Sequence, residues 1–187
     1  MAPEPLTPEA VMTLEAYADT IIPGEKRSPD DRAIAGVSAG GGAVAAGALD
    51  VLLDPAPGTA DGLDGYVDAL NGHARAYAET HELTLDSEVP PFVALDFDDR
   101  TALVQELNSP GHPEKELWVL LTLFSNMAFD TAPHRHTAEA LADGHPGLTA
   151  MGFARPDADG LWRFPDYSYG RPLSTLHPDT TASGSPT

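Results

Sequence analysis

Two histidines in the C-terminal third have a spacing that could serve metal chemistry. His134 and His136 lie two residues apart, on one side of an extended backbone, and His145 could supply a third imidazole. A mononuclear site needs three or four converging ligands. The fourth is left open among three nearby acids: Asp130, Glu139 and Asp143. The pattern favours the alternative, in which these are surface or partner-facing histidines near the start of a helix.

Ser38 lies in a sequence that matches the nucleophile elbow of hydrolases, Gly36-Val37-Ser38-Ala39-Gly40. That chemistry requires a strand leading into the turn, whereas residues 30–35 are charged and tolerant of helix. The sequence therefore predicts a small-residue helix entry in which Ser38 caps or packs. The triplet 40–42 does not complete a dinucleotide fingerprint either, because again no strand precedes it.

Paired carboxylates occur at Asp30-Asp31 and Asp98-Asp99. Both pairs lie in expected loops or first helical turns, where the helix dipole favours acids. General acid–base catalysis needs one carboxyl buried enough to raise its pKa, and these polar flanks predict solvated caps instead.

Composition excludes several classes of function. The 187 residues contain 10 basic and 29 acidic side chains, a net charge of −19, which disfavours binding to nucleic acid or anionic lipid. No cysteine is present, so disulfides, thiolate metal sites and a Cys nucleophile are absent. The N-terminal residues carry neither a Sec-type nor a twin-Arg signal, and no apolar run is long enough to cross a bilayer. We therefore expect a cytoplasmic protein without a membrane span.

Hydrophobic periodicity predicts an all-α fold. Residues 61–79 show the clearest amphipathic pattern, and Thr7-Pro8-Glu9 is a typical helix start. Further helices are expected over 33–53, 98–108, 113–129 and 137–143. The prediction is one helical domain of five or six helices with a long irregular C-terminal segment. Residues 1–143 form its body, 144–177 an extended aromatic-rich segment, and 178–187 a disordered tail.

The segment 131–177 differs in charge from the rest of the chain. It holds four basic and five acidic side chains, so the strong acidic excess nearly vanishes there. Aromatic residues mixed with arginine are enriched in protein interfaces. We expect a docking face made by Phe153, Trp162, Phe164, Tyr167, Tyr169 and Arg171. The alternative is that these aromatics pin the segment to its own helices.

Two stretches resemble a known family. The first is Ala18-Asp19-Thr20-Ile21-Ile22-Pro23-Gly24, followed by Ala33-Ile34-Ala35-Gly36-Val37 and the acid Asp50. The second is Gly144-His145-Pro146-Gly147 with Met151-Gly152-Phe153. Together they resemble the gluconate 2-dehydrogenase subunit 3 family over about residues 7–165.

The resemblance implies a small helical subunit of a large FAD-dependent oxidoreductase of the glucose-methanol-choline type, which oxidises sugars or alcohols. Such subunits carry no redox centre, so the FAD is expected in the partner and no catalytic residue is carried over. The expected function is therefore a non-catalytic subunit that binds and stabilises the flavoenzyme. Two alternatives are a metal-dependent helical enzyme that uses His134, His136 and His145, and a free-standing ligand-binding helical domain.

Overall fold

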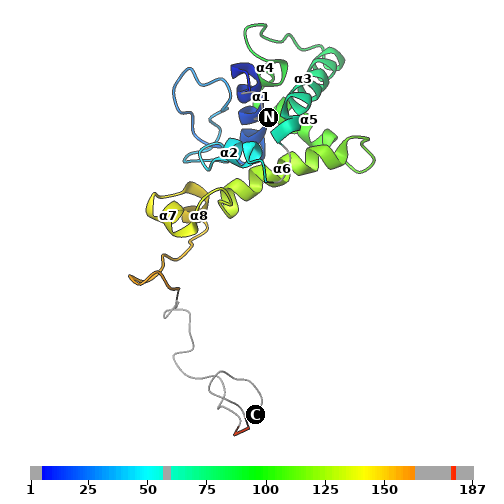
Figure 1. The fold of residues 1–187 in the computed structure, drawn as a ribbon. Helices are drawn as coiled ribbons and strands as arrows, with labels where there is room; N and C mark the ends of the chain where they lie inside the picture. The colour runs from blue at the N-terminus through cyan, green and yellow to red at the C-terminus, as the bar shows by residue number, and fades with distance from the viewer. Residues whose placement is uncertain (1–5, 57–59, 163–177, 180–187) are drawn as a thin grey trace. The chain divides into compact units, whose positions relative to one another are not determined.

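The computed structural model describes residues 6–56, 60–162 and 178–179 of the chain, and it is all-α over these ranges, as predicted (Figure 1). Eight α-helices and one 3-10 turn occur in the described residues, and no strand does. The count exceeds the expected five or six because several helices are only four to six residues long. The elements are α1 (Pro8–Ile21), α2 (Ala48–Leu53), η1 (Ala60–Gly62), α3 (Leu63–Thr80), α4 (Pro91–Ala94), α5 (Phe97–Leu107), α6 (Lys115–Asp130), α7 (Thr137–Ala142) and α8 (Pro146–Ala150).

Helix α1 is the central element of the core and packs against α2, α3, α4, α5 and α6 (Figure 1). Its first turn is built as predicted: the Thr7 hydroxyl accepts a hydrogen bond from the backbone N–H of Ala10 at 3.1 Å, and Pro8 follows the cap. Further along, Tyr17 is buried between the rings of Phe92 and Trp118. The Tyr17 hydroxyl donates to the backbone carbonyl of Trp118 at 3.0 Å, so α1 and α6 are joined by a bond as well as by packing.

The amphipathic pattern of the third helix is confirmed. Leu63, Val67, Leu70 and Ala74 of α3 are buried on one face. Asn71 on the same helix accepts the backbone N–H of Phe92 at 3.1 Å, which fixes the start of α4 against α3. The hydrophobic periodicity therefore predicted this helix correctly, because the apolar face that it defines is the face buried in the core.

The predicted helix over residues 33–53 is wrong for most of its length. Residues 33–47 are irregular, and only Ala48–Leu53 are helical. Gly36, Gly40 and Gly47 adopt left-handed backbone angles, with φ of 75°, 82° and 89°. These angles interrupt a right-handed helix, so the chain bends at these glycines.

The two helices expected over residues 98–108 and 113–129 exist with shifted starts. Asp96, not Asp98, caps α5 and accepts the backbone N–H of Asp99 at 2.9 Å. Helix α6 begins at Lys115, two residues after Pro113, and it packs against α5. Asp96 and Asp98 are both aspartates, and either can cap a helix, so the sequence alone did not show which of them begins α5.

The C-terminal part contains a helix where an extended chain was expected. Residues 146–150 form α8, so the extended interpretation is wrong for them, whereas α7 lies within the predicted 137–143 and is followed by the left-handed Gly144. The chain divides into two compact units, residues 1–153 and 154–187. Most of the second unit and the predicted tail lie outside the described residues. None of the described helices is long and apolar enough to cross a membrane.

Candidate functional site

The three histidines of the metal hypothesis do not assemble into a ligand set. His145 uses both ring nitrogens: Nδ1 accepts the backbone N–H of Leu148 at 3.3 Å, and Nε2 donates to the carbonyl of Ala46 at 3.1 Å. His136 stands at the N-cap position of α7 without a capping bond. Across residues 6–56, 60–162 and 178–179, no group of three or more His, Cys, Asp or Glu side chains could hold a metal ion. The acids Asp130, Glu139 and Asp143 therefore do not complete a site with these histidines.

His134 lies in an open groove of about 480 Å³ between residues 45–50 and the loops that flank α7. Burial lowers the pKa of His134, and its Nδ1 is buried without a hydrogen-bond partner. Arg135 is paired with Asp143 at the rim of the groove. The ring packs against Gly47, where a Cβ would collide with it. His134 is thus packed into the fold, although its neighbours do not make it a ligand or a base.

Ser38 is exposed in the irregular segment 33–47 and makes only a long 3.5 Å contact with the carbonyl of Ala39. No strand precedes it, so the nucleophile elbow is excluded on geometry. The predicted helix entry is wrong as well, because this segment is not helical. Ser38 therefore has neither of the two environments that its sequence suggested.

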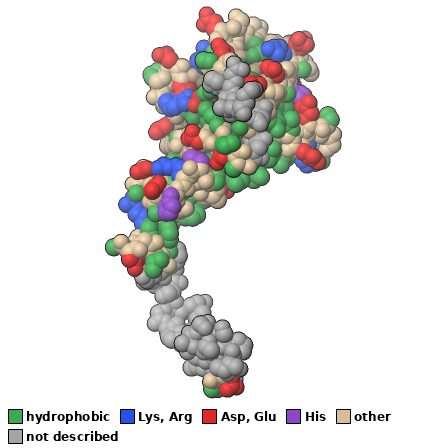
Figure 2. Space-filling model, viewed as in Figure 1, with side chains coloured by type: hydrophobic (Ala, Val, Ile, Leu, Met, Phe, Trp, Pro, Cys, Tyr) green, Lys and Arg blue, Asp and Glu red, His purple; other side chains and the backbone are tan. Residues whose placement is uncertain are grey.

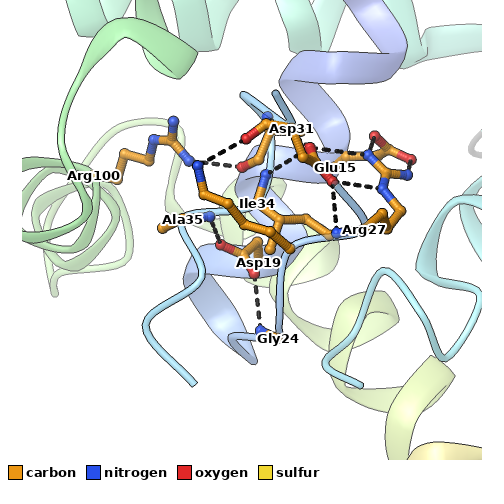
Figure 3. Close-up of polar contacts among 10 residues, drawn as sticks. Glu15, Asp19, Gly24, Arg27, Asp31, Ile34, Ala35 and Arg100 are labelled. Atoms are coloured by element: carbon orange, nitrogen blue, oxygen red, sulfur yellow. Dashed lines mark hydrogen bonds and ion pairs between the residues drawn. The ribbon is translucent and has the colours of Figure 1, made fainter. Parts of the chain in front are cut away.

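The most highly organised polar region is a group of charged side chains around the end of α1, which we call the Asp19 cluster: Glu15, Asp19, Arg27, Asp31 and Arg100 (Figure 3). Asp19 is 1% exposed, and its two carboxylate oxygens accept different backbone donors. Oδ1 accepts the N–H of Gly24 at 3.0 Å, and Oδ2 accepts the N–H of Ala35 at 2.8 Å. One side chain thereby holds the end of α1 to two loops.

Burial raises the pKa of Asp19, and the bonds from Ala35 and Gly24 and the nearby charge of Arg100 oppose that shift. Arg100 is the complementary case: it is 4% exposed, and burial lowers its pKa. Its guanidinium donates to backbone carbonyls, among them that of Ala33 at 2.8 Å and that of Leu95 at 3.0 Å. Both side chains are therefore held inside the protein by bonds to the backbone, and the attraction between their charged forms opposes the effect of burial.

Asp31 is buried, which corrects the prediction that the Asp30-Asp31 pair is a solvated cap. Its carboxylate accepts Nε of Arg27 at 2.7 Å and the backbone N–H of Ile34 at 3.3 Å. Burial alone would raise the pKa of Asp31, but these bonds outweigh it and hold the pKa below its usual value. Arg27 also forms a two-pronged pair with Glu15 at 2.6 and 2.7 Å. The loop 25–31 is consequently pinned to α1, although residues 25–30 remain exposed.

Two glycines complete this arrangement by allowing the backbone to approach closely. A Cβ on Gly24 would lie 2.6 Å from the backbone nitrogen of Gly42. The two segments exchange backbone bonds, from Glu25 N–H to the carbonyl of Gly40 at 2.8 Å and from Ala43 N–H to the carbonyl of Ile22 at 3.0 Å. Residues 22–25 and 40–43 therefore lie side by side, and any side chain at Gly42 would force them apart.

The cluster is built to hold backbone rather than to transfer protons. Each oxygen of Asp19 already accepts a backbone N–H, and Asp31 is satisfied by Arg27 and by loop N–H groups. Open grooves of about 490 Å³ and 230 Å³ border the cluster, and both include charged side chains in their walls. Together with the groove at His134, none of these three is the buried apolar cavity expected of a free-standing ligand-binding domain.

The residues of the second resembling stretch are also structural, and they contact the same irregular segment. Pro146 occupies the first turn of α8, and a Cβ on Gly41 would lie 2.8 Å from its Cβ. Gly147 packs so closely on α6 that a Cβ there would collide with the carbonyl of Phe129. With the bond from His145 to Ala46, both stretches that carry the resemblance are tied to residues 35–46.

A family model described as a family of unknown function, DUF5987, matches residues 8–187. The chain belongs to this family. The match spans the Asp19 cluster, the His145 turn and the aromatic segment, so the DUF5987 region includes both compact units. No curated protein and no solved structure matches the chain.

Of the six residues predicted to form the docking face, two are described in this DUF5987 protein. Phe153 is exposed at the end of the first unit, and Trp162 is exposed in the second. Phe164, Tyr167, Tyr169 and Arg171 lie outside the described residues. The sequence analysis missed Asp19 as a site residue, although one signal was present: an acid in an otherwise apolar helix end, just before Pro23-Gly24.

Proposed function

We propose that this chain is a non-catalytic small subunit that binds and stabilises a large FAD-dependent oxidoreductase of the glucose-methanol-choline type. The enzyme would act on a sugar or an alcohol and would carry the FAD. The chain itself would hold no cofactor. A cytoplasmic location is part of this proposal, and cell fractionation tests it.

The observation that carries the proposal is the part played by the residues that resemble subunit 3 of gluconate 2-dehydrogenase. Asp19, Gly24 and Ala35 from the first stretch bond to one another, and His145 from the second bonds to Ala46. These polar groups hold loops through backbone bonds, which is the arrangement expected where a family shares a scaffold and not a reaction centre. The residues that carry the resemblance therefore have structural roles in this fold.

Exposed apolar side chains supply surface for a partner. On α6, Val119 and Leu123 are exposed one turn apart, and Met151 and Phe153 are exposed after α8. Figure 2 shows hydrophobic side chains among the charged ones on the face that it displays. A partner that binds only the folded subunit and buries such surface would stabilise it, and would itself be stabilised, by mass action.

The test is co-expression with a FAD-dependent oxidoreductase of the glucose-methanol-choline type from the same organism. We expect the two chains to co-purify, and the flavoprotein to be recovered with more bound flavin and higher specific activity than when it is expressed alone. Flavin absorbance per protein and size-exclusion elution measure both effects. A flavoprotein that is flavin-loaded, soluble and fully active without this chain would overturn the proposal.

A further inference from the structure

Residues 154–162, at the start of the second compact unit, form a closed turn. Gly160 N–H donates to the carbonyl of Asp157 at 2.8 Å, and Asp157 N–H donates to the carbonyl of Leu161 at 2.9 Å. The indole Nε1 of Trp162 donates to the carbonyl of Ala154 at 2.7 Å. These bonds join the two ends of the nine-residue segment, which we call the Trp162 turn.

Gly160 is the position in the turn where a substitution is expected to be least tolerated. Its φ is +81°, in the left-handed region, and no atom lies within 4 Å of the position of a Cβ. The constraint on this position is therefore conformational and not steric.

The turn presents apolar surface with its polar atoms already satisfied. Leu161 is 57% exposed and Trp162 is 37% exposed, whereas Trp118, the other tryptophan of the chain, is 0% exposed. Because the indole N–H is bonded to Ala154, a partner that covers Trp162 needs no acceptor for it. The surface left to a partner is the apolar face of the ring and the Leu161 side chain.

We propose that the Trp162 turn is a pre-formed docking element that inserts Trp162 and Leu161 into an apolar pocket of the large flavoprotein subunit. This inference rests on the proposed function. Tryptophan is among the residues that most often dominate binding energy at interfaces. A turn closed before binding also loses less conformational entropy than an unordered segment, so more of the contact energy appears as affinity.

The net charge of the chain, −19, indicates the electrostatic character of the partner. The Trp162 turn itself is nearly balanced, since it contains Arg155 as well as Asp157 and Asp159. Complementary potentials guide encounter and disfavour wrong partners. We therefore expect the partner surface around the apolar pocket to be basic, and association to slow as salt is raised.

The decisive experiment uses the two tryptophans as separate reporters. The full chain is labelled with 5-fluorotryptophan and mixed with the unlabelled flavoprotein, so that only this chain gives ¹⁹F signals. Trp162→Phe assigns the resonances. We expect the Trp162 resonance to move and to lose its H₂O/D₂O isotope shift in the complex, while the Trp118 resonance stays unchanged.

Two variants measure what the turn contributes to affinity. Trp162→Ala should weaken binding to the flavoprotein at least tenfold, whereas Leu83→Ala, which truncates a comparably exposed apolar side chain after α3, should change it less than threefold (about 0.7 kcal/mol or less). Gly160→Ala keeps both contact residues and strains only the turn, so it should weaken binding by about three- to tenfold. Gly65→Ala, in an open position on α3, is its control.

Each outcome bears on the inference. A complex that forms while the Trp162 signal and the Trp162→Ala affinity stay unchanged overturns the docking element and leaves the proposed function intact. Failure to form any complex overturns both. A Trp162 resonance that is already protected from solvent in the isolated chain means that the residue packs on its own protein, or on a second copy if protection depends on concentration, and either result overturns the inference.

Discussion

At the scale of single residues, Asp19 shows why a buried charge can serve structure. A carboxylate removed from water loses several kcal/mol of solvation unless bonds replace it. Here the two oxygens accept the N–H groups of Gly24 and Ala35, which would otherwise be buried donors themselves. Arg100 supplies opposite charge nearby while its own donors go to carbonyls. The cluster thus satisfies loop backbone that no regular element could satisfy.

Asp19→Asn tests this account with the smallest possible change. An amide can accept only one of the two N–H groups and turns its own NH₂ toward the other, so one buried donor loses its partner. We expect the free energy of unfolding to fall by about 1–3 kcal/mol. Urea denaturation followed by circular dichroism measures it.

The control is Asp68→Asn, which removes the same charge from the exposed face of α3. It should alter the free energy of unfolding by no more than about 0.5 kcal/mol. Equal effects of the two variants would mean that Asp19 acts only through net charge, against the account given above.

At the scale of elements, the long helices could be predicted from sequence and the irregular segment could not. Helices α1 and α3 bury one face, so their apolar period of 3.6 residues carries the information. Residues 33–47 are rich in Ala and Gly, and Ala favours helix strongly. What overrides that preference is tertiary: the bonds of residues 40–43 to residues 22–25, and those of Asp19 and Arg100 to Ala35 and Ala33. None of these partners is close in sequence.

The candidate site could likewise be predicted from the sequence only in part. Residues 18–24 and 144–147 were singled out by their resemblance to a known family, but the sequence could not show that Asp31 would be buried and bonded to Arg27, which also binds Glu15. Nor could the sequence show that both ring nitrogens of His145 form hydrogen bonds with the backbone, Nδ1 with Leu148 and Nε2 with Ala46. Histidine and aspartate have the same sequence signature whether they bind backbone or a ligand, so long-range contacts decide between the two.

Gly42→Ala tests the close approach between residues 22–25 and 40–43. The new methyl group would collide with the backbone of Ile22, Pro23 and Gly24, which cannot move aside as a flexible side chain could. We expect a loss of at least about 2 kcal/mol in the free energy of unfolding, with the segments no longer held together. Gly65→Ala has open space on α3 and should stabilise by about 0.5–1 kcal/mol. Similar midpoints for the two variants in urea would contradict the close approach.

At the scale of the whole molecule, the buried core and the Trp162 turn belong to different compact units. Each buried hydrophobic residue of the described ranges lies between Ala10 and Leu148, within the first unit. The exposed Leu161 and Trp162 lie in the second. The core of the first unit therefore does not depend on the side chains of the Trp162 turn for its buried surface.

Truncation after Phe153 separates the docking interpretation of the aromatic segment from the alternative that it pins the chain to its own helices. If the second unit serves docking, removing residues 154–187 leaves the core of the first unit complete, and the free energy of unfolding should change by less than about 1 kcal/mol. If the aromatics pack on the helices, their loss exposes apolar surface worth about 1.5–3 kcal/mol for each large side chain, and the urea midpoint falls steeply. Binding to the flavoprotein should weaken in the truncated protein even though its fold persists. A truncated chain that is unstable but still binds with full affinity would reverse the assignment of the two units.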